Sequence, residues 1–358
     1  MKNNNIYTKG CQWSCVLLLS FFLGGCLHES PELTADGEMG VDPTSVLVNA
    51  TMNLDLNLEN MGIKLESEET KNYLHRFVAV AYLNRQPAYR ATFVEEITDR
   101  THLKLPLQMK LHARDYQLVV WSDFVKKENP EQDYLYQTDD LVPVIPVLSA
   151  HTGNTPFKEV FTLSQPLKLS QYRQELNKVV PIELNLEHPM ARYELVANDV
   201  KTFLQKINQG EIKGQSFKAR IKYSDYLPEG FNALDGVPKH SLLYMQYVKT
   251  IEMPIEEIAE MTLAFDYVFI DPAKKETRIP VEIEIINENN ETIARNNIRI
   301  PCYRSKNSRI SGNFLTKSSE DDGVGIDPDF DGEVDLDVEI TPLHSEKQNV
   351  NQNLSLIY

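Results

Sequence analysis

The stretch that decides the fold is Val46-Leu47-Val48-Asn49-Ala50-Thr51-Met52-Asn53-Leu54-Asp55-Leu56-Asn57-Leu58. One set of alternate positions is apolar throughout, and the other set is mostly polar. A period of two residues is that of a β-strand with one buried face and one wet face. The apolar set is Val46, Val48, Ala50, Met52, Leu54, Leu56 and Leu58.

Short apolar or alternating stretches recur along the chain, with turn-forming residues between them. This spacing is typical of β-sandwiches, so we expect an all-β protein. The proline-rich stretch 130–170 is expected to be mostly loop and edge structure. The other expected strands are residues 77–82, 103–107, 116–121, 179–186, 193–197, 217–223, 263–269, 279–285 and 298–300.

One short helix is expected in the second half of the chain. Val200, Phe203, Leu204 and Ile207 have helical spacing behind Asp199, a candidate N-cap. About 330 residues after residue 25 are enough for two hydrophobic cores. We place the boundary near residues 187–189, which divides the chain into domains 46–186 and 187–341 and a tail, 342–358.

The amino terminus has the order of a bacterial lipoprotein signal. Lys2 and Lys9 precede an apolar run, residues 15–23, and Gly24-Gly25-Cys26 follows it. A run this short cannot span a bilayer, which takes ~20 apolar residues. We therefore expect cleavage between Gly25 and Cys26, removal of residues 1–25, and acylation of Cys26, for example with palmitate. Several acyl chains hold a protein on a membrane where one cannot. Residues 26–45 would then form a tether.

The cysteine count and the net charge limit the disulfides and the partners that can be expected. Cys11 and Cys15 would leave with the signal and Cys26 would carry lipid, so Cys302 alone would remain in the folded part, without a disulfide partner. Its apolar surroundings favour a packing role. The formal net charge of -16 argues against nucleic acid as a partner.

No pattern of an enzyme is present. The eight histidines are scattered without zinc-site spacing, and neither a Gly-x-Ser-x-Gly elbow nor a phosphate-binding glycine loop occurs. We therefore predict a protein that is not an enzyme and that holds no cofactor.

One metal candidate remains open. Asp327, Asp329, Asp331 and Asp335 reproduce the opening of a calcium loop, but its twelfth position is Val338 instead of a bidentate Glu. The same region also alternates as a final strand with an acidic wet face, and we favour that interpretation.

A second open question concerns five aromatic residues, Tyr116, Trp121, Phe124, Tyr134 and Tyr136. Their rings could form a platform on which sugars stack. Because they fall within strand-like segments, they are better explained as core residues.

The chain resembles a known family through blocks that occur in the same order. It is similar to the fimbrillin-like lipoproteins of Bacteroidales, and within them to the FimB-type anchor or accessory branch, which includes an uncharacterised subfamily. The blocks are Val41-Asp42-Pro43-Thr44, Asp115-Tyr116-Gln117-Leu118-Val119-Val120-Trp121-Ser122-Asp123-Phe124, Asp133-Tyr134-Leu135-Tyr136, His188-Pro189-Met190-Ala191-Arg192-Tyr193-Glu194-Leu195, Tyr226-Leu227-Pro228-Glu229-Gly230-Phe231-Asn232, Ala264-Phe265-Asp266-Tyr267-Val268-Phe269 and Ser311-Gly312-Asn313-Phe314-Leu315-Thr316.

The resemblance implies two transthyretin-like, Greek-key β-sandwich domains in tandem and a place in surface fimbriae, whose subunits join by strand exchange. It makes the alternating apolar set of residues 46–58 the candidate exchange strand. Stalk subunits of the family are cleaved after a basic residue ahead of that strand, but residues 27–63 contain no Lys or Arg.

We therefore expect an anchor or accessory subunit whose first strand stays attached to the lipid. Its expected location is the outer membrane, held by the lipid on Cys26 and facing the cell exterior, with fimbrillin-like subunits as partners. The alternative function is that of a glycan-binding or host-adhesive surface lipoprotein.

Overall fold

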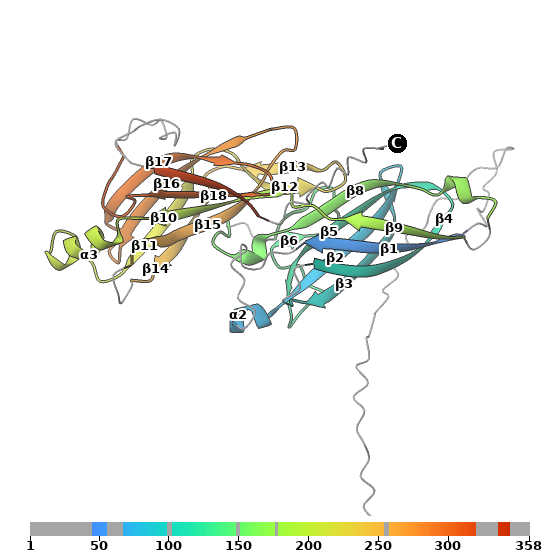
Figure 1. Ribbon diagram of the computed structural model, residues 1–358, viewed down its shortest axis with the longest axis horizontal. Helices are drawn as coiled ribbons and strands as arrows, with labels where there is room; N and C mark the ends of the chain where they lie inside the picture. Colours follow the sequence, from blue (N-terminus) through green and yellow to red (C-terminus); the bar gives the residue numbers. More distant parts are fainter. Residues whose placement is uncertain are drawn as a thin grey trace, which may run out of the picture.

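The computed structural model describes residues 45–55, 67–98, 102–147, 151–175, 178–253, 258–319 and 336–343. Within these residues the chain is predominantly β-structure in two sandwich-like halves, as the sequence predicts. Figure 1 shows the halves end to end along the long axis of the molecule.

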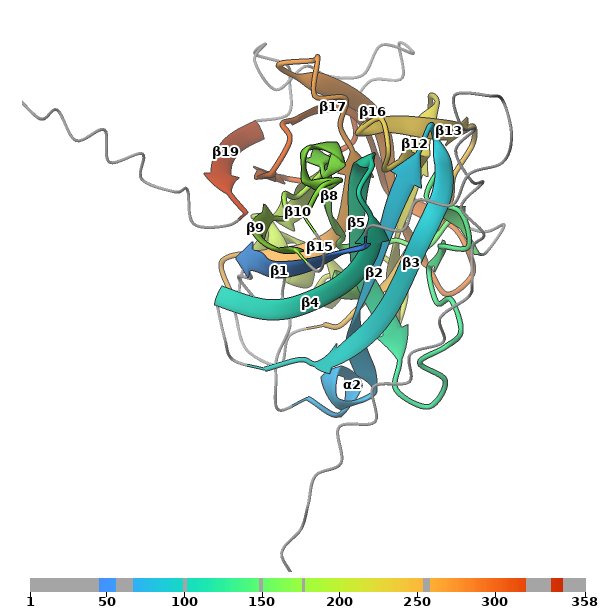
Figure 2. The same cartoon turned by 90° about the vertical axis from the view of Figure 1, so that its right-hand side faces the viewer.

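The first half packs a three-stranded sheet against a four-stranded sheet. The smaller sheet has the order β4-β1-β9 and the larger has the order β3-β2-β5-β8. Figure 2 shows β1 and β4 in one layer and β2, β3 and β5 in another. The strands are β1 (Ser45–Asp55), β2 (Tyr73–Leu83), β3 (Gln86–Glu96), β4 (His102–His112), β5 (Asp115–Lys126), β8 (Phe161–Lys168) and β9 (Lys178–Asn185). Shorter elements connect them: α2 (Glu68–Lys71), β6 (Tyr136–Gln137), β7 (Ile145–Pro146), η1 (Pro156–Lys158) and η2 (Ser170–Tyr172).

The second half is built from two four-stranded sheets. Their orders are β15-β10-β18-β19 and β14-β11-β16-β17, and the hairpin β12-β13 lies beside them toward the first half. The elements are β10 (Met190–Ala197), α3 (Val200–Asn208), β11 (Phe217–Tyr223), β12 (Leu227–Asn232), β13 (Val237–Leu242), β14 (Gln246–Ile251), β15 (Met261–Phe269), β16 (Thr277–Asn287), β17 (Thr292–Cys302), β18 (Lys306–Gly312) and β19 (Leu336–Pro342).

The two halves repeat one topology. In the first, β1 is antiparallel to β4 and parallel to β9; in the second, β10 is antiparallel to β15 and parallel to β18. The order β3-β2-β5-β8 corresponds in the same way to β14-β11-β16-β17. The second half adds the hairpin β12-β13 and the strand β19, which pairs with β18 at the edge of its sheet.

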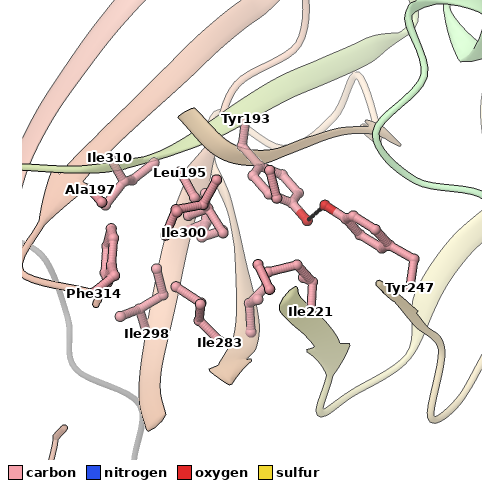
Figure 3. Packing of buried hydrophobic residues seen from close by; sticks show 14 of the residues in the cluster. Tyr193, Leu195, Ala197, Ile221, Tyr247, Ile283, Ile298, Ile300, Ile310 and Phe314 are labelled. Atoms are coloured by element: carbon pink, nitrogen blue, oxygen red, sulfur yellow. Dashed lines mark hydrogen bonds between the residues drawn. The ribbon is translucent and has the colours of Figure 1, made fainter. Parts of the chain in front are cut away.

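Each half has its own apolar core between its sheets. In the second half, Tyr193, Ile221, Ile283 and Ile298 come from four different strands and meet in one cluster (Figure 3). Cys302 lies in the same cluster, fully buried and free, so the predicted packing role is confirmed. Burial raises the pKa of its thiol far above the usual value.

The predicted helix is present as α3, and the N-cap prediction for Asp199 is confirmed for its position only. Asp199 occupies the N-cap position without a side-chain capping bond. Its carboxylate instead accepts hydrogen bonds from the backbone N–H of Leu315 and Thr316, more than a hundred residues away. A tertiary contact therefore takes the place of the local cap.

Candidate functional site: the first strand and the junction of the halves

The predicted exchange strand forms β1, the central strand of its sheet. Val48 lies opposite Met109 of β4 on one side and Val180 of β9 on the other. A central strand has its backbone hydrogen-bonding groups shared between two neighbours, whereas an edge strand leaves one row of them open. β1 is thus fully integrated into the first half.

The side chains of β1 divide as the sequence predicts. Val46, Val48 and Met52 are fully buried, and Ala50 and Leu54 nearly so. The opposite face is half-exposed, and there the Nδ2 of Asn53 donates to Glu183 and Asn185 of β9. Leu56 and Leu58, the last two residues of the candidate set, lie outside the described residues.

Both edges of this sheet carry a proline. Pro106 of β4 lies opposite Thr51, and Pro181 of β9 lies opposite Asn49. Proline has no N–H to donate, so it occurs in edge strands and weakens them as templates for a further strand. Of the three positions in this sheet, the central one occupied by β1 is therefore the best suited to hold a strand firmly.

Several predicted sites lie outside the described residues. They are the lipidation residue Cys26, the cleavage position Gly25 and the calcium candidates Asp327, Asp329, Asp331 and Asp335. The predicted final strand is present as β19, with Asp337 and Glu339 exposed. Within the described ranges, no three His, Cys, Asp or Glu side chains are grouped so that they could hold a metal ion. A search of the same ranges finds no helix long and apolar enough to cross a membrane.

The five aromatic candidates belong to the interior. Tyr116, Trp121, Phe124 and Tyr136 are buried, and Tyr134 is half-buried with its hydroxyl against that of Tyr73. Their rings are not available as a platform for sugars, so the core interpretation is confirmed.

Trp121 lies where the two halves meet. Its ring centroid is 6.2 Å from that of Phe231 in β12 and 6.4 Å from that of Phe269 in β15. The backbones of Val144 and Phe231 exchange two hydrogen bonds across the junction. Gly230 permits this approach, because a Cβ there would lie 2.7 Å from the carbonyl oxygen of Val144. An apolar cluster, which we call the junction cluster, thus joins the halves.

A group of buried charges lies at the same junction. His151 and Lys158 come from the segment before β8, whereas Glu229 and Asp266 come from β12 and β15. The Nε2 of His151 is 2.6 Å from Asp266 Oδ2 and its Nδ1 is 2.9 Å from Glu229 Oε1. Lys158 Nζ donates to Asp266 Oδ1 at 3.0 Å. Two cations of one half therefore face two carboxylates of the other.

The charges at the junction shift each other's proton affinity. Burial and Lys158 lower the pKa of His151, but Asp266 and Glu229 outweigh them and the pKa is raised. Burial raises the pKa of Asp266, yet Lys158, His151 and the Tyr223 hydroxyl bring it down to about 2. Both shifts favour the ionised pair, which suits a fixed electrostatic contact between the halves.

Sequence reasoning did not find this group, because its members are up to 115 residues apart. The available signal was Asp266, a charged residue inside the apolar stretch 263–269. A charge placed in a buried strand needs a partner of opposite sign, and that requirement predicts a contact without naming the other residue.

A family model matches residues 43–353, and its description is "Family of unknown function (DUF6562)". The chain belongs to this family. The match includes β1 and every later described strand, so both halves are part of the family's common region. No curated protein matches the chain.

Solved structures similar to the chain include two from bacteria of the genera Parabacteroides and Porphyromonas. One is a fimbrial assembly protein from Parabacteroides distasonis, with 12% sequence identity over 83% of this chain and 99% of that chain, and a TM-score of 0.38. Another is the fimbrial anchor protein Mfa2 from Porphyromonas gingivalis, with 9% identity over 84% of this chain and 100% of that chain, and a TM-score of 0.40.

Proposed function

We propose that this protein is a lipid-anchored surface protein that serves as an anchor or accessory subunit of fimbriae. It would be held on the outer membrane through Cys26, face the cell exterior and bind fimbrillin-like subunits. The resemblance of its sequence blocks to the FimB-type branch supports this function. The structural observation that carries it is the position of β1, buried on one face and paired along both sides.

Strand exchange would need a vacant place in a sheet, and in the first half β1 fills that place. Because residues 27–63 contain no Lys or Arg, cleavage after a basic residue ahead of β1 cannot separate β1 from the lipid, as it does in stalk subunits of the family that the chain resembles. A subunit that keeps its first strand would not accept a strand there. It would therefore end a series of subunits instead of continuing it.

The junction supports the same role. A terminal subunit links the lipid to the load of the attached filament, so its two halves must transmit force without separating. The junction cluster and the buried charges of His151, Lys158, Glu229 and Asp266 join the halves through apolar packing and through opposite charges.

The function is tested by comparing intact cells that carry the tagged protein with cells that carry Cys26→Ala. We expect fimbrillin-like subunits to copurify with the wild type and to resist mild elution, because exchanged strands dissociate slowly. In the Cys26→Ala cells, both the protein and these subunits should appear in the medium. Cys15→Ala, a cysteine substitution inside the predicted signal segment, is the matched control and should behave as the wild type.

Two results would contradict the proposal. The first is recovery of the protein alone, or with outer-membrane glycan importers, which would favour the glycan-binding alternative. The second is a mature amino terminus within residues 45–60 on intact cells, which would mean that β1 does not stay attached to the lipid.

A further inference from the structure

The outer face of the sheet β14-β11-β16-β17 is rich in cations, although the chain as a whole is strongly acidic, with a formal net charge of -16. Lys218, Arg220 and Lys222 alternate along β11 with the core residues Phe217, Ala219, Ile221 and Tyr223, so they point away from the core. Arg295 and Arg299 have the same orientation on β17. The face also carries the carboxylates of Glu282 and Glu284 on β16.

Glu284 holds three of these cations in place. Its side chain is 2% exposed and receives hydrogen bonds from Arg220, Lys222 and Arg295. Burial raises its pKa, but these three partners bring the pKa down to about 2, so the carboxylate stays ionised. Glu282 also accepts a hydrogen bond from Lys222, at 2.6 Å. The five cations named on this face nevertheless outnumber its two carboxylates, and the shared partner Glu284 fixes the position of three of them.

An exposed apolar patch lies along the edge strand β14 and at one end of this face. Among the described residues, four of the seven exposed large hydrophobic side chains belong to the short stretch 226–248: Tyr226, Leu243, Tyr244 and Val248. Val248 lies opposite Arg220. The carbonyl of Met245 accepts a hydrogen bond from the N–H of Tyr223, at the end of β11. Tyr244 is the residue before Met245, so it also lies near that end of β11. The pairing of Leu227 with Leu242 brings Tyr226 close to Leu243.

The backbone in this patch is strained. Tyr244, 83% exposed, has a φ of 57°. A bulky residue at positive φ is uncommon and costs conformational free energy. Tyr244 is not part of the core of the second half, so packing in that core does not account for its backbone conformation.

We propose that this cationic face, with the apolar patch at its end, is a docking surface for an acidic polysaccharide. Alternate residues of a strand are about 6.7 Å apart, so Lys218, Arg220 and Lys222 form a straight row of charges that suits the regularly spaced acid groups of a linear polymer. The rings of Tyr226 and Tyr244 offer flat apolar surfaces on which sugar rings can stack. This proposal is independent of the fimbrial role.

The test is binding of the purified full chain to three probes at about 0.15 M salt, where exposed charges more than about 8 Å apart are screened. Polygalacturonate carries carboxylates, dextran sulfate carries sulfates, and unmodified dextran is neutral. We expect binding to at least one polyanion and none to dextran. The polyanion that binds identifies the acid group recognised.

Variants decide whether this face is responsible. The double variant Lys218→Glu with Arg299→Glu should weaken binding at least tenfold, and so should Tyr244→Ala, which leaves the charge unchanged. The matched control is Lys104→Glu with Lys110→Glu on the exposed face of β4 in the other half, which makes the same charge change and should alter binding less than twofold. Absence of binding to both polyanions, equal weakening by the control, or an unchanged affinity in Tyr244→Ala would overturn the proposal.

Discussion

Buried charged side chains in this protein are paired, and Arg76 is the clearest example. Its guanidinium donates to both oxygens of Asp123, at 2.8 and 2.6 Å, and to Asp133 at 2.6 Å. Burial alone would lower the pKa of Arg76, but the two carboxylates outweigh it and the pKa is raised. The energetic importance of such a pair appears when one partner is removed, because the other charge is then left buried without compensation.

We predict that Asp123→Asn lowers the free energy of unfolding by about 3 kcal/mol, measured by urea denaturation. Asp235→Asn is the matched control, because Asp235 forms a similar two-bond contact with Arg85, but the side chains of that pair are 41% and 62% exposed. Solvent screens an exposed pair, so the control should change stability far less. Equal effects of the two substitutions would show that burial of the Arg76 pair adds nothing.

Two buried histidines should give opposite dependences on pH. The pKa of His151 is raised, so its contribution to stability is complete below about pH 6.5 and is lost as the pH rises through the folded-state pKa. Burial lowers the pKa of His75 to about 3, and the Glu159 carboxylate offsets this only partly. A neutral His75 therefore contributes stability that is complete above pH 6.5 and is lost as the pH falls toward 3.

The measurement is the free energy of unfolding of the wild type, His151→Asn and His75→Asn between pH 4 and 9. The advantage of the wild type over His151→Asn should shrink above pH 6.5, whereas its advantage over His75→Asn should shrink below pH 6.5. Each variant serves as the control for the other. A common direction in both differences would contradict the assignment of charged His151 and neutral His75.

At the scale of single elements, what the sequence could predict depended on how each strand is buried. β1 and β4 alternate strictly because one face of their sheet is wet, and the sequence predicts both. β3 has residues of intermediate exposure on both faces, so neither alternation nor an apolar run marks it, and it was missed. β12, β13 and β14 were missed for the related reason that their pairing follows from tertiary contacts at the junction and the sheet edge.

The central position of β1 is open to a direct test. Asn49→Pro removes a backbone donor from a strand that is paired on both sides, and we expect it to lower the free energy of unfolding by at least about 2 kcal/mol. Gln108→Pro is the matched control: Gln108 lies opposite Asn49 on the edge strand β4 and has the same orientation as the natural Pro106. We expect it to be tolerated.

Urea denaturation measures both changes, and hydrogen exchange at β4 and β9 shows whether the loss is local to this sheet. Increased exchange in both neighbours of β1 is expected for Asn49→Pro alone. If Gln108→Pro were as harmful as Asn49→Pro, β1 would have no special place in the sheet, and the proposal that it occupies an exchangeable central position would lose its physical basis.

At the scale of the whole molecule, the two halves have the same strand topology. They are joined by elements that occur in only one of them. The hairpin β12-β13 has no counterpart in the first half, and it supplies Glu229 and Phe231 to the junction. A sequence alone predicts most strands of the repeated part, because each sandwich has its own pattern of strands. It does not predict the junction, because residues such as Trp121 and Phe231 are apolar in either a core or an interface.

The junction therefore gives the last prediction, with Trp121 as its natural reporter. The chain has two tryptophans, Trp13 and Trp121, and processing at Cys26 would leave Trp121 alone. Phe231→Ala should open the junction cluster to water, shift Trp121 emission to longer wavelength, and separate thermal unfolding into two transitions, one for each half.

Phe203→Ala is the matched control. Phe203 is equally buried but packs against Phe217 inside the second core, with ring centroids 5.0 Å apart and away from the junction. Both substitutions should lower the free energy of unfolding by about 3–5 kcal/mol, as large-to-small changes of buried Phe do. Only Phe231→Ala should change the emission of the native protein, because only that residue contacts Trp121. A single transition with unchanged emission in Phe231→Ala would mean that the buried charges of His151 and Asp266, and not the apolar cluster, couple the two halves.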